Sequence, residues 1–325
     1  MTFLQFLPFL ILVVLANFAE RQNVLKYIVY GLLILLDGAC LLLSVFAAVM
    51  HLAMPYMEEA TGIPMEVFAR MDLIGLALTL FGMGVAGLVI LLPPVRRWFA
   101  RFLPLNPASP LHSTALSFAI YYVGVSVAQI QLAGGLEGLA ELSLETSPLE
   151  MLLSGLSLAL FGILGAGLWV RRKPSETAQR LGLTLPTWRQ VGLAAGAIAG
   201  FLALDLGVSW AWHALDPEGY RFITGVGLGI FGELTVAKAA AIGLSAGFGE
   251  EILFRGAVQP RFGLWVTAVL FAAGHTQYGL SPAFFEVLLI GVVLGLIRKK
   301  ANTTTCIAIH TLYNFLDILL VPLFP

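Results

Sequence analysis

Long apolar runs, separated by short polar segments, recur along the whole chain. A helix that rises 1.5 Å per residue needs about 20 such residues to cross ~30 Å of hydrocarbon. Ten runs approach or reach this length, and each predicts a membrane helix. Their predicted limits are residues 2–19, 27–50, 71–92, 114–133, 150–170, 191–213, 235–255, 262–279, 283–298 and 303–321.

The first run is interpreted as a retained helix and not as a signal peptide. No basic segment precedes it, and no convincing small-residue cleavage site follows it. Pro8 leaves open a helix that is only half buried in the membrane.

Composition supports the same fold class. Of the 325 residues, 59% are hydrophobic and 11% are charged, whereas about a quarter are charged in ordinary soluble domains. The apolar runs leave no room for a separate soluble domain. We therefore expect an all-α, polytopic membrane bundle of about ten transmembrane helices.

The net charge of -1 hides an asymmetry between successive loops. Short loops rich in Lys and Arg stay in the cytoplasm. This rule predicts a multi-pass protein of the cell membrane with both termini outside the cytoplasm. Basic residues follow every odd-numbered run, namely Arg21, Lys26, Arg96, Arg97, Arg101, Arg171, Arg172, Lys173, Arg180, Arg189, Arg255, Arg261, Arg298, Lys299 and Lys300. The intervening loops are acidic or neutral and carry Glu58, Glu59, Glu66, Glu137, Glu141, Glu145, Asp216 and Glu218.

These basic loops do not predict a nucleic-acid surface. No basic run carries the interleaved aromatic residues of such a surface, and topology alone explains the arginines. The expected partners are the lipid bilayer and a membrane-associated peptide or protein, with no nucleic acid. Cys40 and Cys306 fall inside predicted spans without zinc-like spacing and are expected to be packing residues.

The longest polar stretch, residues 171–190, divides the chain into two parts. Residues 1–180 form a predicted five-helix region of unknown role, and residues 181–325 form a predicted catalytic bundle. Glycines four residues apart allow close helix approach in lipid. Three such pairs lie in the C-terminal part, namely Gly196 and Gly200, Gly243 and Gly247, and Gly291 and Gly295.

In the seventh run, Glu251 and Arg255 are four residues apart on one helix face and are predicted to form an ion pair. Glu250 points elsewhere, and the positions three and four residues after it hold Leu253 and Phe254. An unpaired carboxylate in an apolar pocket is suited to act as a general base for water. The alternative is that both acids only mark the cytoplasmic end of a helix.

Two further motifs place polar groups inside the membrane. His310 and Asn314 are four residues apart on the last run, and both can donate a hydrogen bond to a developing oxyanion. His275 lies one turn after Phe271 on the eighth run. Placing an ionisable group in the hydrocarbon of the membrane costs about 3 kcal/mol or more. Such groups therefore usually face a protein cavity and one another. The three motifs are therefore predicted to converge on one cavity.

Depth follows from the distance to the nearest basic loop. At 1.5 Å per residue, Glu250 lies about 8 Å from Arg255, and His310 lies about 15 Å from Lys300. Both are predicted in the cytoplasmic half of the membrane. His275 lies about 21 Å from Arg261, so the eighth helix must tilt strongly or begin deeper for the motifs to meet.

The motifs EExxxR, FxxxH and HxxxN, in this order on successive helices, resemble those of the CAAX protease and bacteriocin-processing family, also called the ABI family. The resemblance covers about residues 181–321. It implies an intramembrane glutamic endopeptidase, similar to the type II CAAX prenyl endopeptidases, that needs no cofactor. By the same resemblance, Glu250 and His275 would activate a water, and His310 and Asn314 would hold the oxyanion. Glu251, Arg255 and Phe271 would be supporting residues.

Two other functions stay open. A metalloprotease would ligate zinc with Glu250, His275 and His310, a ligand set of two His and one Glu that occurs in catalytic sites. A transporter or a non-proteolytic membrane scaffold would use the same fold without hydrolysis. Inhibition by a chelator would favour zinc, and activity that survives loss of the Glu and His residues would favour the scaffold.

Residues 243–247, GLSAG, match the GxSxG motif of a nucleophilic serine. That motif belongs on a strand-to-helix turn, whereas this segment is predicted to be a membrane helix. Ser245 is therefore not expected to be catalytic, since helix packing accounts for the two glycines. The remaining charges inside the spans are expected to need partners, and Glu286 or Asp317 is expected to line the cavity. These charges are Asp37, Asp205, Lys238, Glu286 and Asp317.

Overall fold

The computed structural model describes residues 3–61, 70–143 and 146–320, and within these ranges it contains helices and no strands. Glu66 and Glu145 lie outside the described residues. The helices are η1 (Phe3–Phe6), α1 (Leu7–Ala19), α2 (Asn23–Thr61), α4 (Leu73–Ile90), α5 (Pro93–Phe99), α6 (Pro110–Ala133), α7 (Leu136–Leu142), α8 (Pro148–Gly165), α9 (Pro174–Leu181), α10 (Trp188–Leu215), α11 (Pro217–Phe231), α12 (Val236–Leu244), η2 (Ser245–Val258), α13 (Gln259–Ala273), η3 (Thr276–Tyr278), α14 (Pro282–Lys300) and α15 (Thr303–Leu320).

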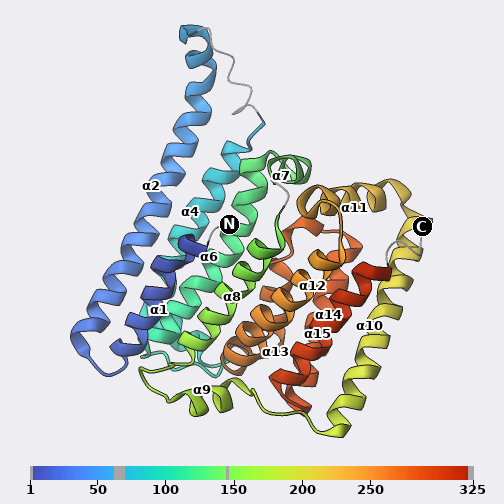
Figure 1. The fold of residues 1–325 in the computed structure, drawn as a ribbon. Helices are drawn as coiled ribbons and strands as arrows, with labels where there is room; N and C mark the ends of the chain where they lie inside the picture. The colour runs from blue at the N-terminus through green and yellow to red at the C-terminus, as the bar shows by residue number, and fades with distance from the viewer. Residues whose placement is uncertain (1–2, 62–69, 144–145, 321–325) are drawn as a thin grey trace.

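The two parts of the chain stand side by side. Figure 1 shows α1 to α8 on one side and α10 to α15 on the other, with α9 lying across one end of the bundle. The polar stretch 171–190 thus contains a short helix, α9, before an extended segment leads into α10. Thr187 caps α10, since its side chain accepts a hydrogen bond from the Gln190 backbone while Gln190 bonds back to Thr187.

Each of the ten predicted runs contains a helix, but the count of ten crossings is not confirmed. By length and composition, five helices of the described chain can cross a membrane: α2, α4, α6, α8 and α10. The pair formed by α11 and the segment Val236–Ala273 is bent by 92° and makes a sixth candidate if it is one span. Helix α1 has only 13 residues. The chain is therefore an all-α, multi-pass membrane protein.

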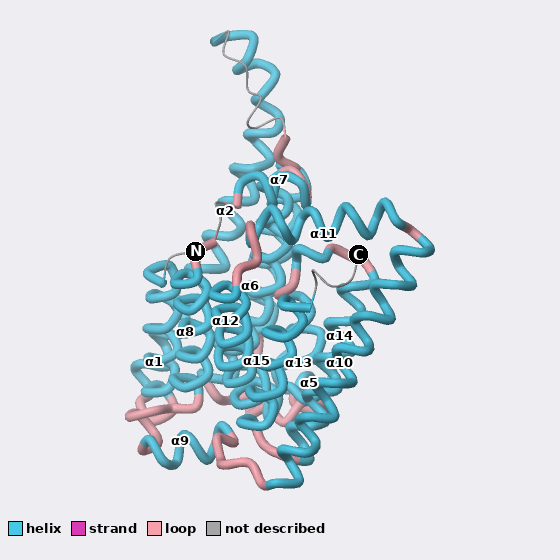
Figure 2. Tube along the Cα trace, turned by 45° about the vertical axis from the view of Figure 1, so that its right-hand side comes forward, coloured by secondary structure: helices cyan, strands magenta, loops and turns pink. Residues whose placement is uncertain are grey.

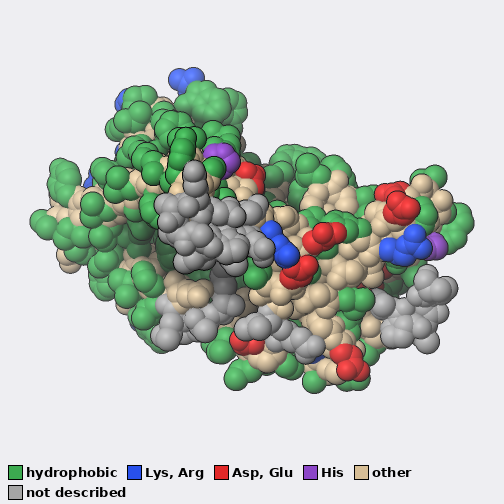
Figure 3. Space-filling view, turned by 90° about the horizontal axis from the view of Figure 1, so that it is seen from above, with side chains coloured by type: hydrophobic (Ala, Val, Ile, Leu, Met, Phe, Trp, Pro, Cys, Tyr) green, Lys and Arg blue, Asp and Glu red, His purple; other side chains and the backbone are tan. Residues whose placement is uncertain are grey.

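Basic and acidic connections lie at opposite ends of the bundle. The turn between α1 and α2, helix α9 and the turn between α14 and α15 lie at one end, and α7 and α11 lie at the other (Figures 1 and 2). Viewed from the α7 and α11 end, acidic side chains stand out on the face, and hydrophobic side chains line much of its rim (Figure 3). This separation agrees with the alternation predicted from the loops, while the side that faces the cytoplasm stays a prediction.

Two of the three glycine pairs make the predicted close contacts. A Cβ atom on Gly247 would lie 1.9 Å from Thr311 Oγ1, and one on Gly291 would lie 3.0 Å from the Phe271 ring. The prediction is wrong for Gly196 and Gly200, because no atom lies within 4 Å of a Cβ at either position. These two glycines lie on the exposed face of α10, whereas Ala197 and Phe201 on its other face pack against α14 and α15.

The N-terminal part holds a buried acid at a close helix contact. The Asp37 side chain is fully buried and accepts a hydrogen bond from the Tyr121 hydroxyl. A Cβ atom on Gly87 would lie 1.8 Å from Asp37 Oδ1, whereas one on Gly82 of the same helix would meet no atom within 4 Å. Asp37 thus has the partner that a charge at this depth needs.

We expect Gly87→Ala to destabilise the protein by about 1–3 kcal/mol, because the added methyl group would force Asp37 away from Tyr121. Gly82→Ala is the matched control and should leave stability unchanged or slightly higher, since that face of α4 is open. Thermal unfolding of the purified protein in detergent measures both effects. Equal unfolding temperatures for the two variants would contradict this account.

Candidate active site

The first motif lies on a wide helical segment. The π-helix η2, Ser245–Val258, continues from α12 and carries Glu250, Glu251 and Arg255. Such segments are rare and occur frequently at functional sites. Close contacts fix η2 on two sides, since a Cβ atom on Gly247 would lie 2.9 Å from the Ile307 carbonyl of α15 and one on Gly249 would lie 2.5 Å from the Gly155 carbonyl of α8.

Glu251 connects the first and third motifs. Its Oε2 atom lies 3.3 Å from Arg255 Nε, which confirms the ion pair expected from the spacing. Its Oε1 atom lies 3.0 Å from His310 Nδ1 on α15, a contact that the sequence analysis did not foresee. Glu251 and Arg255 are fully buried and His310 is nearly so. The Glu251 carboxylate, held by Arg255, therefore also orients the imidazole ring of His310.

The Phe271 ring lies at the centre of these groups. Its centroid is 5.1 Å from that of His275 and 5.8 Å from that of His310. The Arg255 guanidinium carbon lies over the same ring, 4.7 Å from its centroid. A cation over an aromatic face is attracted by the ring quadrupole, which is strongest away from water. Phe271 thus has contacts with all three motifs, while its supporting role in catalysis stays a prediction.

His275 lies outside a helix, which corrects the predicted run 262–279. Helix α13 ends at Ala273, and Gly263 interrupts it with φ 74° and ψ 177°. His275 precedes the short helix η3, and its Nδ1 atom lies 3.0 Å from the Phe271 carbonyl oxygen. A carbonyl oxygen only accepts, so Nδ1 carries the hydrogen and Nε2 of the neutral ring has the free lone pair.

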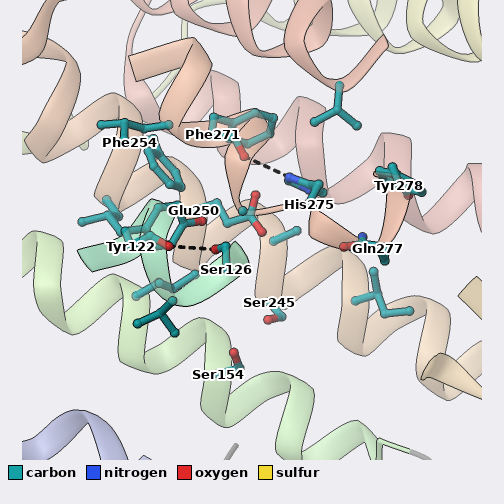
Figure 4. Close-up of a pocket in the computed structure, with 18 of the residues that line it drawn as sticks. Tyr122, Ser126, Ser154, Ser245, Glu250, Phe254, Phe271, His275, Gln277 and Tyr278 are labelled. Carbon is teal, nitrogen blue, oxygen red and sulfur yellow. Dashed lines mark hydrogen bonds between the residues drawn. The ribbon is translucent and has the colours of Figure 1, made fainter. Parts of the chain in front are cut away.

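The three motifs meet at one cavity of about 1540 Å³. The sequence predicts this convergence, because it is unfavourable to bury the ionisable groups of each motif separately in the hydrocarbon. Glu250, His275, His310 and Asn314 all line it. Figure 4 shows the Glu250 and His275 side chains at this cavity. The Glu250 Oε2 atom is buried and has no hydrogen-bond partner among the described residues, whereas Glu251 lies in an ion pair with Arg255 and contacts His310. The predicted difference between the adjacent acids is therefore present.

The N-terminal part also contributes to the cavity wall. Tyr122 and Ser126 of α6 and Ser154 of α8 line it (Figure 4). Tyr122 is close enough to interact electrostatically with Glu250. No hydrogen bond joins a described residue before 171 to Glu250, His275 or His310. Sequence reasoning missed Tyr122, because nothing in the pattern of α6 distinguishes this tyrosine from a packing residue.

Ser245 has a structural partner. Its hydroxyl donates a hydrogen bond to the Met151 carbonyl oxygen on α8 at 2.7 Å. The described part of the chain contains no group of three or more His, Cys, Asp or Glu side chains arranged to hold a metal ion. The predicted zinc ligands Glu250, His275 and His310 line one cavity but do not form such a group.

The expected partners are present for some of the other charges inside the predicted spans, but the Glu286 Oε1 atom is buried without a hydrogen-bond partner among the described residues. Lys238 Nζ donates to the Phe231 carbonyl oxygen at 2.7 Å. The carboxyl groups of Asp205 on α10 and Asp317 on α15 lie close enough to interact with each other. Glu286 and Asp317 both line the cavity, which confirms that prediction.

The comparisons with known proteins concern the C-terminal part of the chain. Residues 232–316 match a family model described as "Type II CAAX prenyl endopeptidase Rce1-like". The uncharacterized protein YpbD of Bacillus subtilis (strain 168) is 32% identical over 114 residues, which is 34% of this chain. The match spans 56% of YpbD, so a little over half of that relative is covered. No solved structure matches significantly.

The matched region begins just before α12 and ends within α15, so it contains all three motifs. The resemblance that these motifs predict is thereby confirmed: the segment 232–316 of this chain is similar to the Rce1-like family of type II CAAX prenyl endopeptidases.

Proposed function

We propose that this protein is an intramembrane endopeptidase that hydrolyses a peptide bond of a membrane-associated substrate by direct attack of an activated water. The main support is the cavity at which the half-buried carboxylate of Glu250, whose Oε2 atom has no hydrogen-bond partner among the described residues, meets His275, His310 and Asn314. General acid and base groups need to reach the reacting atoms within one cavity. The similarity of residues 232–316 to an endopeptidase family supports the same reaction class.

In this mechanism Glu250 takes a proton from the attacking water, and His275 orients that water. Because the His275 Nδ1 hydrogen is donated to the Phe271 carbonyl, Nε2 of the neutral ring is free to accept a hydrogen bond from the water. The protonated Glu250 then returns its proton to the leaving amine. One water is consumed, and a carboxylate and an amine are formed.

The oxyanion of the tetrahedral intermediate would be held by His310 and Asn314. With Glu251 ionised beside Arg255, His310 donates its Nδ1 hydrogen to Glu251. His310 can then donate from Nε2 only as an imidazolium, and the Glu251 carboxylate would face this cation as well as Arg255. The Asn314 carboxamide supplies a second donor one turn further along α15. Removal of one such donor typically costs about 10²–10³ in rate.

The test is comparative membrane peptidomics of cells that contain the wild-type protein or Glu250→Gln. New peptide termini that require Glu250 would support hydrolysis and identify the substrate. The result would favour a transporter or scaffold if the peptide pattern is unchanged and if the wild-type protein and Glu250→Gln equally rescue a growth defect of cells that lack the protein. The division of labour between residues 1–180 and 181–325 also stays a proposal, since α6 and α8 both line the cavity.

We expect chelators to leave cleavage unchanged. Cleavage of an identified substrate is measured after treatment with 1,10-phenanthroline or EDTA and dialysis. The glutamate mechanism predicts rates within about twofold of the untreated protein, because a general base needs no metal. Loss of cleavage that zinc restores would instead support zinc held by Glu250, His275 and His310.

A further inference from the structure

Four arginines gather where the cavity reaches the α9 end of the bundle. Arg171 and Arg172 follow α8, Arg180 lies on α9, and Arg261 lies on α13. All four line the same cavity as Glu250. We call them the arginine cluster. They come from segments on both sides of the division between the two parts of the chain, so the fold brings them together.

The arginine cluster is not neutralised by the protein. None of its guanidinium groups forms an ion pair with a carboxylate among the residues that the structure describes. Burial, followed by repulsion from Arg261, Arg172, Arg298 and Arg171, lowers the pKa of Arg180 to about 10. All four side chains are half-buried, and holding several like charges together at such a place is unfavourable unless an anion joins them.

The nearest acid is already engaged. Glu20 attracts Arg171 electrostatically, but its Oε1 atom accepts hydrogen bonds from the Ser109 hydroxyl and the Leu111 backbone at the start of α6. The cluster thus carries four positive charges against one negative charge. A ligand that balances it needs more than the single charge of one carboxylate.

Most of the donors in the cluster are free to bind a ligand. Arg180 donates from Nη1 to the Gly256 carbonyl and Arg172 donates from Nη1 to the Ala166 carbonyl. Each guanidinium has five N–H groups, so these contacts leave most donors unused. The Arg171 Nε atom is buried and has no hydrogen-bond partner in the part of the chain that the structure describes. Guanidinium groups match phosphate oxygens with paired hydrogen bonds, which ammonium groups cannot do.

An apolar wall runs from the cluster toward the middle of the bundle. Phe262 is buried beside Arg261, and Phe118 of α6 and Phe161 of α8 line the same cavity with their rings in contact. A charged end joined to an apolar wall fits an amphiphile. Basic pockets between membrane helices near the bilayer surface bind the headgroups of anionic lipids.

We infer that the arginine cluster binds the phosphate groups of an anionic phospholipid, with an acyl chain lying along the Phe118 and Phe161 wall. Such a lipid would connect α8 and α9 with α13 through its headgroup. The arginine cluster lines the same cavity as Glu250 but includes none of the groups proposed for hydrolysis, so the inference does not depend on protease activity.

The test uses the full-length purified protein in detergent and native mass spectrometry with cardiolipin, phosphatidylglycerol and phosphatidylcholine. We expect cardiolipin to bind most tightly and phosphatidylcholine least, because the cluster has an excess of positive charge. The double variant Arg171→Gln/Arg180→Gln should bind cardiolipin at least about tenfold more weakly, since each basic group near the surface contributes roughly a factor of five. Arg97→Gln/Arg101→Gln is the matched control, since both side chains are exposed and lie outside the cavity.

Several results would overturn the inference. Equal weakening in the control variant would mean that binding depends only on the general charge of this end of the bundle. Complete competition by millimolar inorganic phosphate would indicate a site for a soluble anion, and competition by a short peptide with a free carboxylate would indicate a substrate terminus. If the Gln variant does not fold, Arg171→Lys/Arg180→Lys keeps the charge and should still weaken cardiolipin binding, because Lys lacks the paired donors.

Discussion

Glu250→Gln should abolish peptide-bond hydrolysis and leave the fold intact. The substitution keeps the size and shape of the side chain but removes the group that takes the proton from water. Loss of a general base typically costs about 10²–10⁴ in rate. The Glu250 Oε2 atom has no hydrogen-bond partner among the described residues, so little structural interaction is lost. Cleavage of a substrate found by peptidomics, measured in proteoliposomes, gives the rate.

Glu233→Gln is the matched control for Glu250→Gln, because Glu233 lies in the turn between α11 and α12 and does not line the cavity. Its cleavage rate should equal that of the wild-type protein. Both variants should express and unfold like the wild type. Retention of more than about a tenth of the wild-type rate by Glu250→Gln would rule out its role as the general base.

Glu251→Gln should instead destabilise the protein, by about 3–5 kcal/mol, because it leaves the buried Arg255 charge without its carboxylate. Glu251 and Arg255 are both fully buried. The Arg255 Nη1 and Nη2 atoms have no hydrogen-bond partner among the described residues. The same change removes the carboxylate that orients His310, so cleavage should also fall. Thermal unfolding in detergent and cleavage in proteoliposomes measure the two effects separately.

A double variant tests whether the unpaired charge is the cause. Glu251→Gln/Arg255→Met removes both charges and should unfold at a higher temperature than Glu251→Gln alone, because no buried cation is left. It should still cleave poorly, since His310 lacks its partner. If the single and double variants unfold at the same temperature, packing and not charge is responsible for the loss. Equal stability of Glu250→Gln and Glu251→Gln would contradict the distinction between the two acids.

The local pattern was enough for the helices and for the ion pair within one turn. Apolar runs predicted a helix in all ten places, because a chain in hydrocarbon must satisfy its backbone hydrogen bonds within the helix. The spacing of Glu251 and Arg255 predicted their contact, because residues four apart share a helix face. The prediction was less accurate where a glycine alters the backbone, since Gly263 interrupts α13 and His275 lies beyond its end.

The sequence by itself therefore determined the all-α membrane character, a helix in each of the ten apolar runs, the three motifs and the likeness to an endopeptidase family. Each of these follows from side chains within a few turns of one another or from a motif. The sequence did not predict α5, α7, α9 and α11, which lie between those runs. Only the tertiary structure decided that Glu251 reaches His310, that Phe271 contacts all three motifs, that Tyr122 stands near Glu250, and that four arginines from separate segments share one cavity. These contacts join distant residues, and they depend on how helices pack in three dimensions, which helical periodicity does not specify.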